Sequence, residues 1–132
     1  MKKIGFIGIG LMGFPMAKNI LKSGYSLKVF NRSLAKAEAL EEFGAEIAKT
    51  VEELVKDSDV VITMLTDDKA VDEVMSSSSF LENLKPGLIV IDMSSIKQKK
   101  KKKIFSLIKM RNNTQQQQKK RKVPRRVHFL LL

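Results

Sequence analysis

Short apolar runs alternate with helical patterns over the first 96 residues of the chain. Glycine, proline or polar residues bound the apolar runs, which are typical of strands buried on both faces. The intervening segments carry apolar residues at the spacing of an amphipathic helix. The expected strands are residues 3–8, 26–30, 45–48, 59–65 and 88–93, and the expected helices are residues 11–22, 33–44, a short segment after Thr50, and 67–75. This alternation predicts an α/β fold, a Rossmann-type doubly wound parallel sheet that is incomplete at five strands, with its ligand at the carboxyl ends of the strands.

Local signals mark where the helices begin and end. Ser33 is expected to cap the second helix, and Thr50 with Glu53 forms a capping box before the third. Gly24 suits the left-handed position after the first helix. The serines at 76–79 predict a polar break before the Pro86-Gly87 turn into the last strand.

The composition changes after Ile96. Residues 97–132 hold 14 of the 25 basic residues and none of the 14 acidic ones, so the net charge of +11 belongs to this tail. Dense like charges and a glutamine run predict a disordered segment, apart from a short helix over residues 104–110. We therefore expect a Rossmann domain over residues 1–96 and a disordered, basic, low-complexity tail over residues 97–132, in which His128 is inert.

Composition also predicts the compartment. The chain has no cysteine, which excludes disulfides and thiolate metal sites and fits a reducing environment. Its apolar runs are far shorter than a membrane span, and the apolar run after Lys3 is too short and too rich in glycine for a secretion signal. We expect a cytoplasmic protein that contacts no membrane.

A glycine motif follows the first expected strand and opens the first expected helix. Gly8 allows the tight turn, Gly10 lets a pyrophosphate approach the backbone, and Gly13 lets helix and strand pack closely. The free N–H groups near Leu11 and Met12 are expected to bind the anion. A flexible turn is the alternative, but the strand–loop–helix context favours a dinucleotide site.

The end of the second strand predicts which dinucleotide binds. A carboxylate at this position would accept a hydrogen bond from the adenosine ribose, but the chain has Asn31, Arg32 and Ser33 instead, with Lys36 one turn further on. Arg32 can make a forked contact to a phosphate. The pattern therefore favours NADP, with NAD as the alternative; a solvated arginine beside a simple serine cap would explain the same residues.

The first 96 residues resemble the β-hydroxyacid dehydrogenase family, which includes 3-hydroxyisobutyrate dehydrogenase and the NADPH-dependent glyoxylate and succinic semialdehyde reductases. The same kind of domain binds NADP in 6-phosphogluconate dehydrogenase. The resemblance covers residues 1–96. It rests on residues 6–19 (Phe-Ile-Gly-Ile-Gly-Leu-Met-Gly-Phe-Pro-Met-Ala-Lys-Asn), 29–33 (Val-Phe-Asn-Arg-Ser), 59–65 (Asp-Val-Val-Ile-Thr-Met-Leu) and 84–96 (Leu-Lys-Pro-Gly-Leu-Ile-Val-Ile-Asp-Met-Ser-Ser-Ile).

The resemblance implies roles for three further residues. Leu65 and Thr66 would line the nicotinamide end of the cofactor, with Thr66 in place of the family's usual proline. Ser95 matches a serine or threonine that touches the cofactor near the substrate.

The family pattern stops after Ile96. Lys97 and Gln98 replace the family's Ser-Pro, and the family's Gly-Gly loop, catalytic lysine and helical C-terminal domain have no match in the tail. We assign no catalytic residue, and whether this chain is an enzyme stays open. A frameshift or mis-splicing after residue 96 is one hypothesis for the tail, and translation of the other reading frames would test it.

These patterns predict the NADP(H)-binding domain of an oxidoreductase that acts on small hydroxyacids or aldehydes, inactive as this fragment. Two alternatives remain, non-specific nucleic-acid binding through the basic tail and a non-catalytic NADP-binding protein. The five-strand sheet would leave its sixth-strand side and one face uncovered, which predicts marginal stability and self-association.

Overall fold

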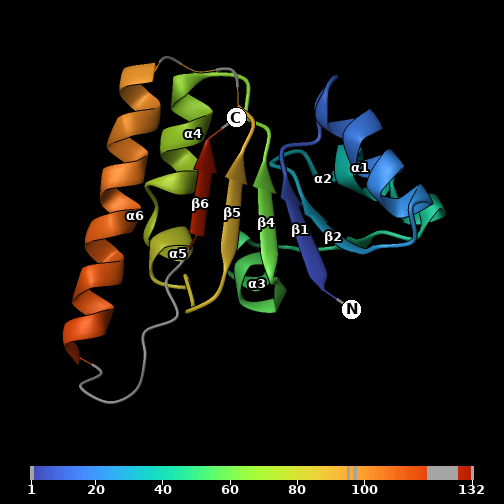
Figure 1. The fold of residues 1–132 in the computed structure, drawn as a ribbon. Helices are drawn as coiled ribbons and strands as arrows, with labels where there is room; N and C mark the ends of the chain where they lie inside the picture. Colours follow the sequence, from blue (N-terminus) through green and yellow to red (C-terminus); the bar gives the residue numbers. More distant parts are fainter. Residues whose placement is uncertain (1, 95, 97, 119–127, 132) are drawn as a thin grey trace.

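The computed structural model describes residues 2–94, 96, 98–118 and 128–131. In these residues one parallel sheet has the strand order β3-β2-β1-β4-β5-β6, shown in Figure 1. The strands are β1 (Lys3–Ile7), β2 (Ser26–Phe30), β3 (Glu46–Ile47), β4 (Val60–Thr63), β5 (Ile89–Asp92) and β6 (His128–Leu131). The order is that of the dinucleotide-binding fold, and it reverses direction between β1 and β4. The predicted Rossmann-type architecture is confirmed, with a sixth strand that the sequence did not predict.

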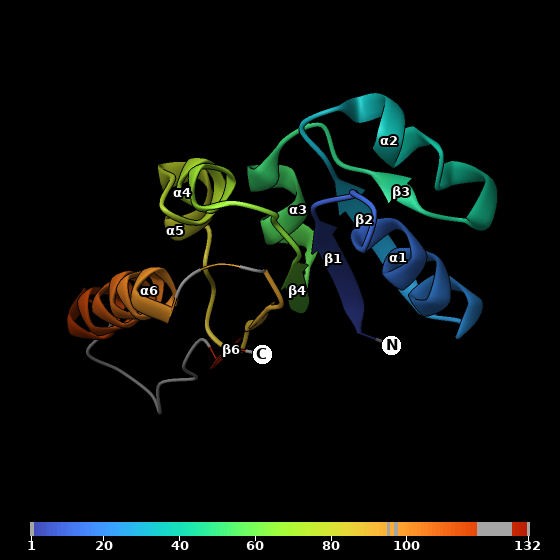
Figure 2. The ribbon, with the colours of Figure 1, turned by 90° about the horizontal axis from the view of Figure 1, so that it is seen from above.

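Helices cover the sheet on both sides. The described helices are α1 (Gly13–Lys22), α2 (Leu34–Glu38), the 3₁₀ helix η1 (Glu41–Phe43), α3 (Val51–Asp57), α4 (Asp68–Met75), α5 (Ser78–Leu81) and α6 (Gln98–Gln118). Seen from above, α1 lies on the opposite side of the strands from α4, α5 and α6 (Figure 2). Two cores result, one joining α1, α2 and η1 to the sheet and one joining α3, α4, α5 and α6 to it.

The centre of β1 belongs to both cores. Phe6 packs on the α1 side and Ile7 on the other, and both are fully buried. Gly5, the residue before Phe6, leaves no room for a side chain, because a Cβ there would lie 2.4 Å from the Ser58 Oγ at the end of α3. The apolar run at the N-terminus therefore forms the central strand.

The helices after β2 and after α4 differ from the predictions. The helix expected over residues 33–44 is broken into α2 and η1, and it ends at Gly44 with φ +97°. Ser33 occupies the cap position of α2 without a side-chain hydrogen bond, whereas the Thr50 hydroxyl accepts a 3.1 Å bond from the Glu53 N–H. The expected break at 76–79 contains the start of α5, because the Ser77 side chain caps that short helix.

The structure also differs from the predicted disordered tail in two segments, α6 and β6. Ile104 and Ile108 lie one helical turn apart, and both are buried in the core beside α4 and α5. The Lys100 ammonium pairs with Asp72 of α4 and lowers the pKa of that carboxyl. The predicted helix over residues 104–110 is thus the middle of a longer helix, held by a two-residue apolar stripe.

Strand β6 covers the edge of the sheet that was expected to be open. It pairs with β5 in parallel, and the backbone N–H of His128, a residue expected to be inert, donates a 2.7 Å hydrogen bond to Leu88. The rings of Phe129 and Phe105 lie 5.8 Å apart, which ties β6 to α6. Strand β6 packs here for two physical reasons. The edge of β5 would otherwise have unpaired backbone groups, and α6 and β6 both carry apolar side chains that can be buried.

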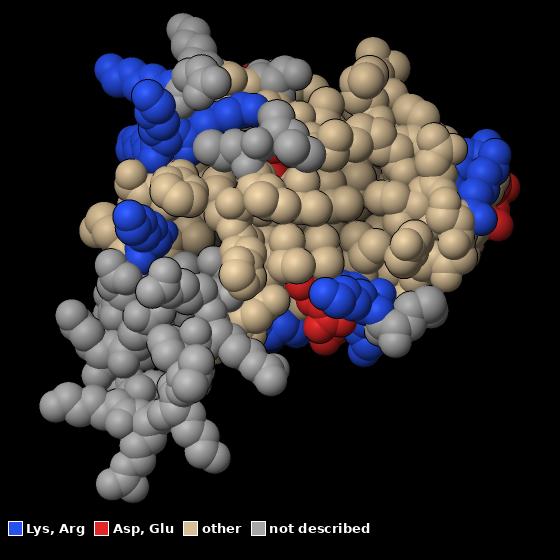
Figure 3. All heavy atoms as spheres, viewed as in Figure 1, with Lys and Arg blue, Asp and Glu red and all other residues tan. Residues whose placement is uncertain are grey.

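No described helix covers one face of β4, β5 and β6. Ile62, Ile91 and Leu130 are neighbours in register on this face, and Leu130 is half exposed. Figure 3 shows a broad uncharged surface here, with Lys and Arg side chains gathered near the N-terminal end of α6. Self-association through the uncharged face stays a prediction.

Within the described ranges, no helix is long and apolar enough to cross a bilayer, and no cluster of His, Cys, Asp or Glu could hold a metal.

The packing of α6 predicts that Ile104→Ala lowers the free energy of unfolding by about 2–4 kcal/mol, because it leaves a cavity in the core. Ser106→Ala, at an exposed position of the same helix, is the control and should change it by less than about 0.5 kcal/mol. Urea denaturation followed by circular dichroism measures both. Equal effects of the two substitutions would show that α6 does not pack on the domain.

Candidate dinucleotide-binding site

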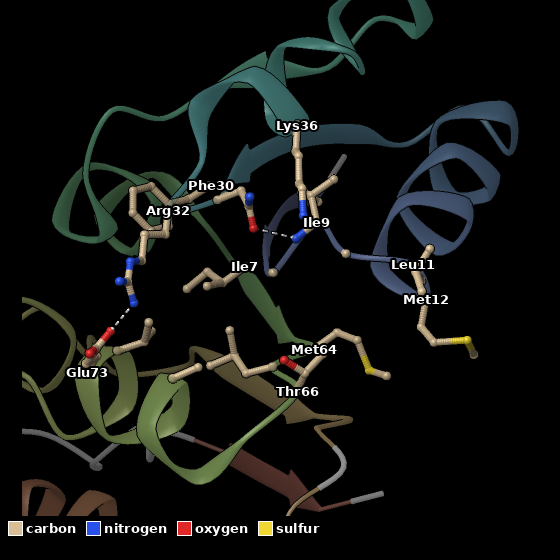
Figure 4. Close-up of a pocket in the computed structure, with 16 residues that line it drawn as sticks. Ile7, Ile9, Leu11, Met12, Phe30, Arg32, Lys36, Met64, Thr66 and Glu73 are labelled. Atoms are coloured by element: carbon tan, nitrogen blue, oxygen red, sulfur yellow. Dashed lines mark hydrogen bonds and ion pairs between the residues drawn. The ribbon is translucent and has the colours of Figure 1, made fainter.

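A cleft of about 500 Å³ lies at the carboxyl ends of the strands, where the strand order reverses. Its walls come from the loop after β1, the end of β2, the loop after β4, and α4 (Figure 4). Nine of the residues predicted to bind cofactor line it, namely Gly8, Gly10, Leu11, Met12, Asn31, Arg32, Lys36, Leu65 and Thr66. Gly13 and Ser33 do not line the cleft, and Ser95 lies outside the described residues.

The three glycines of the loop have three different environments. Gly8 has φ +104°, and a Cβ there would lie 2.1 Å from the carbonyl oxygen of Met64. A Cβ on Gly13 would lie 1.9 Å from the carbonyl oxygen of Gly8. Gly10 has no atom within 4 Å of that position and opens onto the cleft. Two glycines therefore serve the fold, and Gly10 leaves space that a ligand can enter.

Helix α1 begins at Gly13, two residues later than predicted, and its N-cap residue Met12 lines the cleft. The Gly10 carbonyl accepts a 3.0 Å hydrogen bond from Phe14, which starts the helix directly after the loop. The first N–H groups of a helix have no partner within it and carry the positive end of its dipole. Leu11 is 97% exposed and Met12 62% exposed, so the backbone here is open to an anion.

Asn31 holds the glycine loop against the end of β2. Its Oδ1 accepts a 2.9 Å hydrogen bond from the Ile9 N–H, and its Nδ2 donates a 3.0 Å bond to the Ser33 carbonyl. The Gly8 N–H donates to Phe30 in the same place, at 3.1 Å. The amide of Asn31 is thus engaged in positioning the loop, a role that its place in the sequence did not indicate.

Arg32 meets an acidic residue across the cleft. Its Nη1 donates a 2.9 Å bond to the Glu73 Oε2 of α4, and the two side chains point toward each other in Figure 4. Lys69 lies 3.9 Å from the other carboxylate oxygen of Glu73. The sequence did not predict a role for Glu73. It lies 41 residues after Arg32, and the helical pattern around it does not indicate which strand end its side chain faces.

A buried polar network lies behind Leu65, which lines the cleft. The Asp92 Oδ1 accepts bonds of 3.0 Å from the Thr63 hydroxyl and 2.9 Å from the Ser94 N–H. The Ser94 hydroxyl in turn accepts a 2.8 Å bond from the Leu65 N–H. The Asp92 Oδ2 is buried and has no partner in the described structure. This network fixes the loop that bears Leu65 and Thr66. The polar residues Thr63 and Asp92 at the ends of two buried strands were the sequence feature that could have predicted it.

Comparison with known proteins identifies the class of the domain. Residues 3–115 match the family described as the NAD binding domain of 6-phosphogluconate dehydrogenase, a match that extends past residue 96 into α6. The chain therefore belongs to this family, and the resemblance to β-hydroxyacid dehydrogenases is confirmed.

Three relatives illustrate the match. The uncharacterized oxidoreductase YkwC of Bacillus subtilis is 43% identical over 97 residues, 73% of this chain and 34% of that protein. The NAD-dependent L-serine dehydrogenase of Pseudomonas aeruginosa is 39% identical over 97 residues, 73% of this chain and 33% of that protein. The structure of an imine reductase from Myxococcus stipitatus in complex with NADP⁺ has a TM-score of 0.75 at 26% identity, covering 98% of this chain and 39% of that one. The chain thus spans about a third of the length of these curated relatives.

The glycine geometry predicts effects of different size for two similar substitutions. Gly13→Ala should lower the free energy of unfolding by about 1–3 kcal/mol, because its Cβ would collide with rigid backbone. Gly10→Ala is the matched control and should change it by less than about 0.5 kcal/mol, since space is open there. Chemical denaturation of the two variants checks this. Similar losses in both would mean that the loop packs differently from the structure described.

Proposed function

We propose that this chain is the NADP(H)-binding domain of an oxidoreductase for small hydroxyacids or aldehydes. The observation that carries the proposal is the helix N-terminus and open Gly10 backbone in the same cleft as Arg32 and Lys36. The helix N-terminus suits the pyrophosphate, and the two cations suit a phosphate on the adenosine ribose.

NAD is the alternative cofactor. The domain family is described as NAD binding, one relative is named as NAD-dependent, and one similar structure contains NADP⁺. The side chains at the end of β2 support NADP, because Asn31, Arg32 and Ser33 bring no carboxylate from that strand.

The oxidoreductase part of the proposal rests on the family, and no catalytic residue is assigned within this chain. Hydride transfer to a carbonyl needs a general acid for its oxygen. Leu65 and Thr66 are the described residues expected to line the nicotinamide end. Neither side chain can act as a general acid or base near neutral pH. We therefore propose that the 132-residue chain alone binds the dinucleotide without turning over substrate. NADPH-dependent reduction of glyoxylate or succinic semialdehyde by the purified chain would contradict this.

Arg32→Ala should weaken NADPH binding about tenfold, because a charge-assisted contact to the phosphate is lost. NADH binding should change by less than about twofold, since NADH has no phosphate at this position. Nicotinamide fluorescence measures both affinities.

Lys22→Ala is the control for Arg32→Ala, because it removes an exposed positive charge at the far end of α1. It should leave both affinities unchanged. Failure of the unsubstituted chain to bind either dinucleotide would overturn the proposed function. Equal losses for NADPH and NADH in Arg32→Ala would overturn the preference for NADP.

A further inference from the structure

The cleft has a carboxylate, but it comes from a helix and not from the end of β2. Among the residues that line the described cleft, Glu73 is the only acidic one. Its Oε2 lies 2.9 Å from the Arg32 Nη1, although the two residues are 41 positions apart in the chain. The cation expected to bind a ribose phosphate therefore already has an anionic partner within the protein.

A carboxylate and a phosphate compete for the same donors of a guanidinium group. Both accept its parallel N–H bonds, so a phosphate that reaches Arg32 must share or displace the bond to Glu73. A phosphate seated there would also lie well within one Debye length of the Glu73 carboxylate, and the two like charges repel each other. An unphosphorylated ribose neither displaces Glu73 from Arg32 nor repels its carboxylate, and the ribose hydroxyl can donate a hydrogen bond to that carboxylate.

We propose that Glu73 is a specificity-determining residue that lowers the preference of this site for NADP(H) over NAD(H). The proposal rests on the proposed function, because it concerns how the same cleft reads the ribose. Glu73 takes the part of the acidic residue that NAD-binding domains carry at the end of β2, but it reaches the site from α4. Arg32 and Glu73 then act in opposite directions on one ligand group.

The exposure of the pair limits the size of the effect. The Arg32 side chain is 80% exposed and that of Glu73 is 42% exposed, so water screens their attraction and the pair can open. Lys69, which also faces Glu73 at 3.9 Å, would remain after Glu73 is neutralised and would add to the positive field. A change of several-fold in affinity is therefore expected.

The test compares Glu73→Gln with Asp68→Asn, which removes the same charge from an exposed position on α4 that does not line the cleft. Glu73→Gln should bind NADPH about three- to tenfold more tightly than the unsubstituted chain. Its affinity for NADH should stay the same or fall. Asp68→Asn should leave the ratio of the two affinities within about twofold, because screening reduces its influence on the distant phosphate.

Two fragments isolate the ribose contact from the rest of the cofactor. Adenosine 2′,5′-bisphosphate should gain affinity in Glu73→Gln, whereas adenosine 5′-monophosphate should not. Raising the salt concentration to about 1 M should shrink the gain, because it shortens the Debye length to about 3 Å. Isothermal titration calorimetry measures each fragment, and thermal melting confirms that the variants are folded.

Three results would overturn the role of Glu73. They are an unchanged NADPH-to-NADH ratio in Glu73→Gln, weaker NADPH binding in that variant, and an equal gain in Asp68→Asn. These results leave the proposed function standing, provided that the unsubstituted chain binds a dinucleotide. If the unsubstituted chain binds neither NADPH nor NADH, the proposed function itself fails.

Discussion

The absence of Cβ atoms at the carboxyl end of β1 is the constraint on which the rest of the structure depends. A side chain at Gly8 would collide with the backbone of the β4 loop, and one at Gly13 would collide with the backbone of Gly8. Because the atoms that a Cβ would meet belong to the backbone, no repacking of side chains could relieve these collisions. The close approach lets α1 begin directly after the glycine loop, with its N-cap residue Met12 at the cleft.

The loops around the cleft are held by polar side chains that have no need to touch a ligand. Asn31 fixes the glycine loop to the end of β2, and the Asp92–Ser94 network fixes the loop after β4. Such preorganised loops have lower ordering costs when a cofactor binds. Asn31, which its position predicts to bind cofactor, thus contributes by holding the neighbouring glycine loop in place.

Electrostatics in the cleft come from two different parts of the chain. Arg32 and Lys36 follow β2, whereas Glu73 belongs to α4, and the fold brings them together. Under the proposed function, recognition of a ribose phosphate would depend on a balance of opposite charges that no single segment specifies. The tail shows the same dependence on context. The basic segment after residue 96 packs on the domain because Ile104 and Ile108 contact an apolar surface formed by other helices.

The sequence by itself determined the five strands of the first 96 residues, the parallel sheet, the place of the glycine loop and the helices other than α5. It did so because apolar periodicity, glycine and capping residues act over a few neighbouring positions. Helix boundaries were less certain where a pattern such as residues 33–44 allows both α and 3₁₀ turns. Only the tertiary structure decided that the tail adds α6 and β6, that Asn31 braces the loop and that Glu73 faces Arg32. These features depend on contacts between segments as much as 41 residues apart, and local patterns carry no information about such distances.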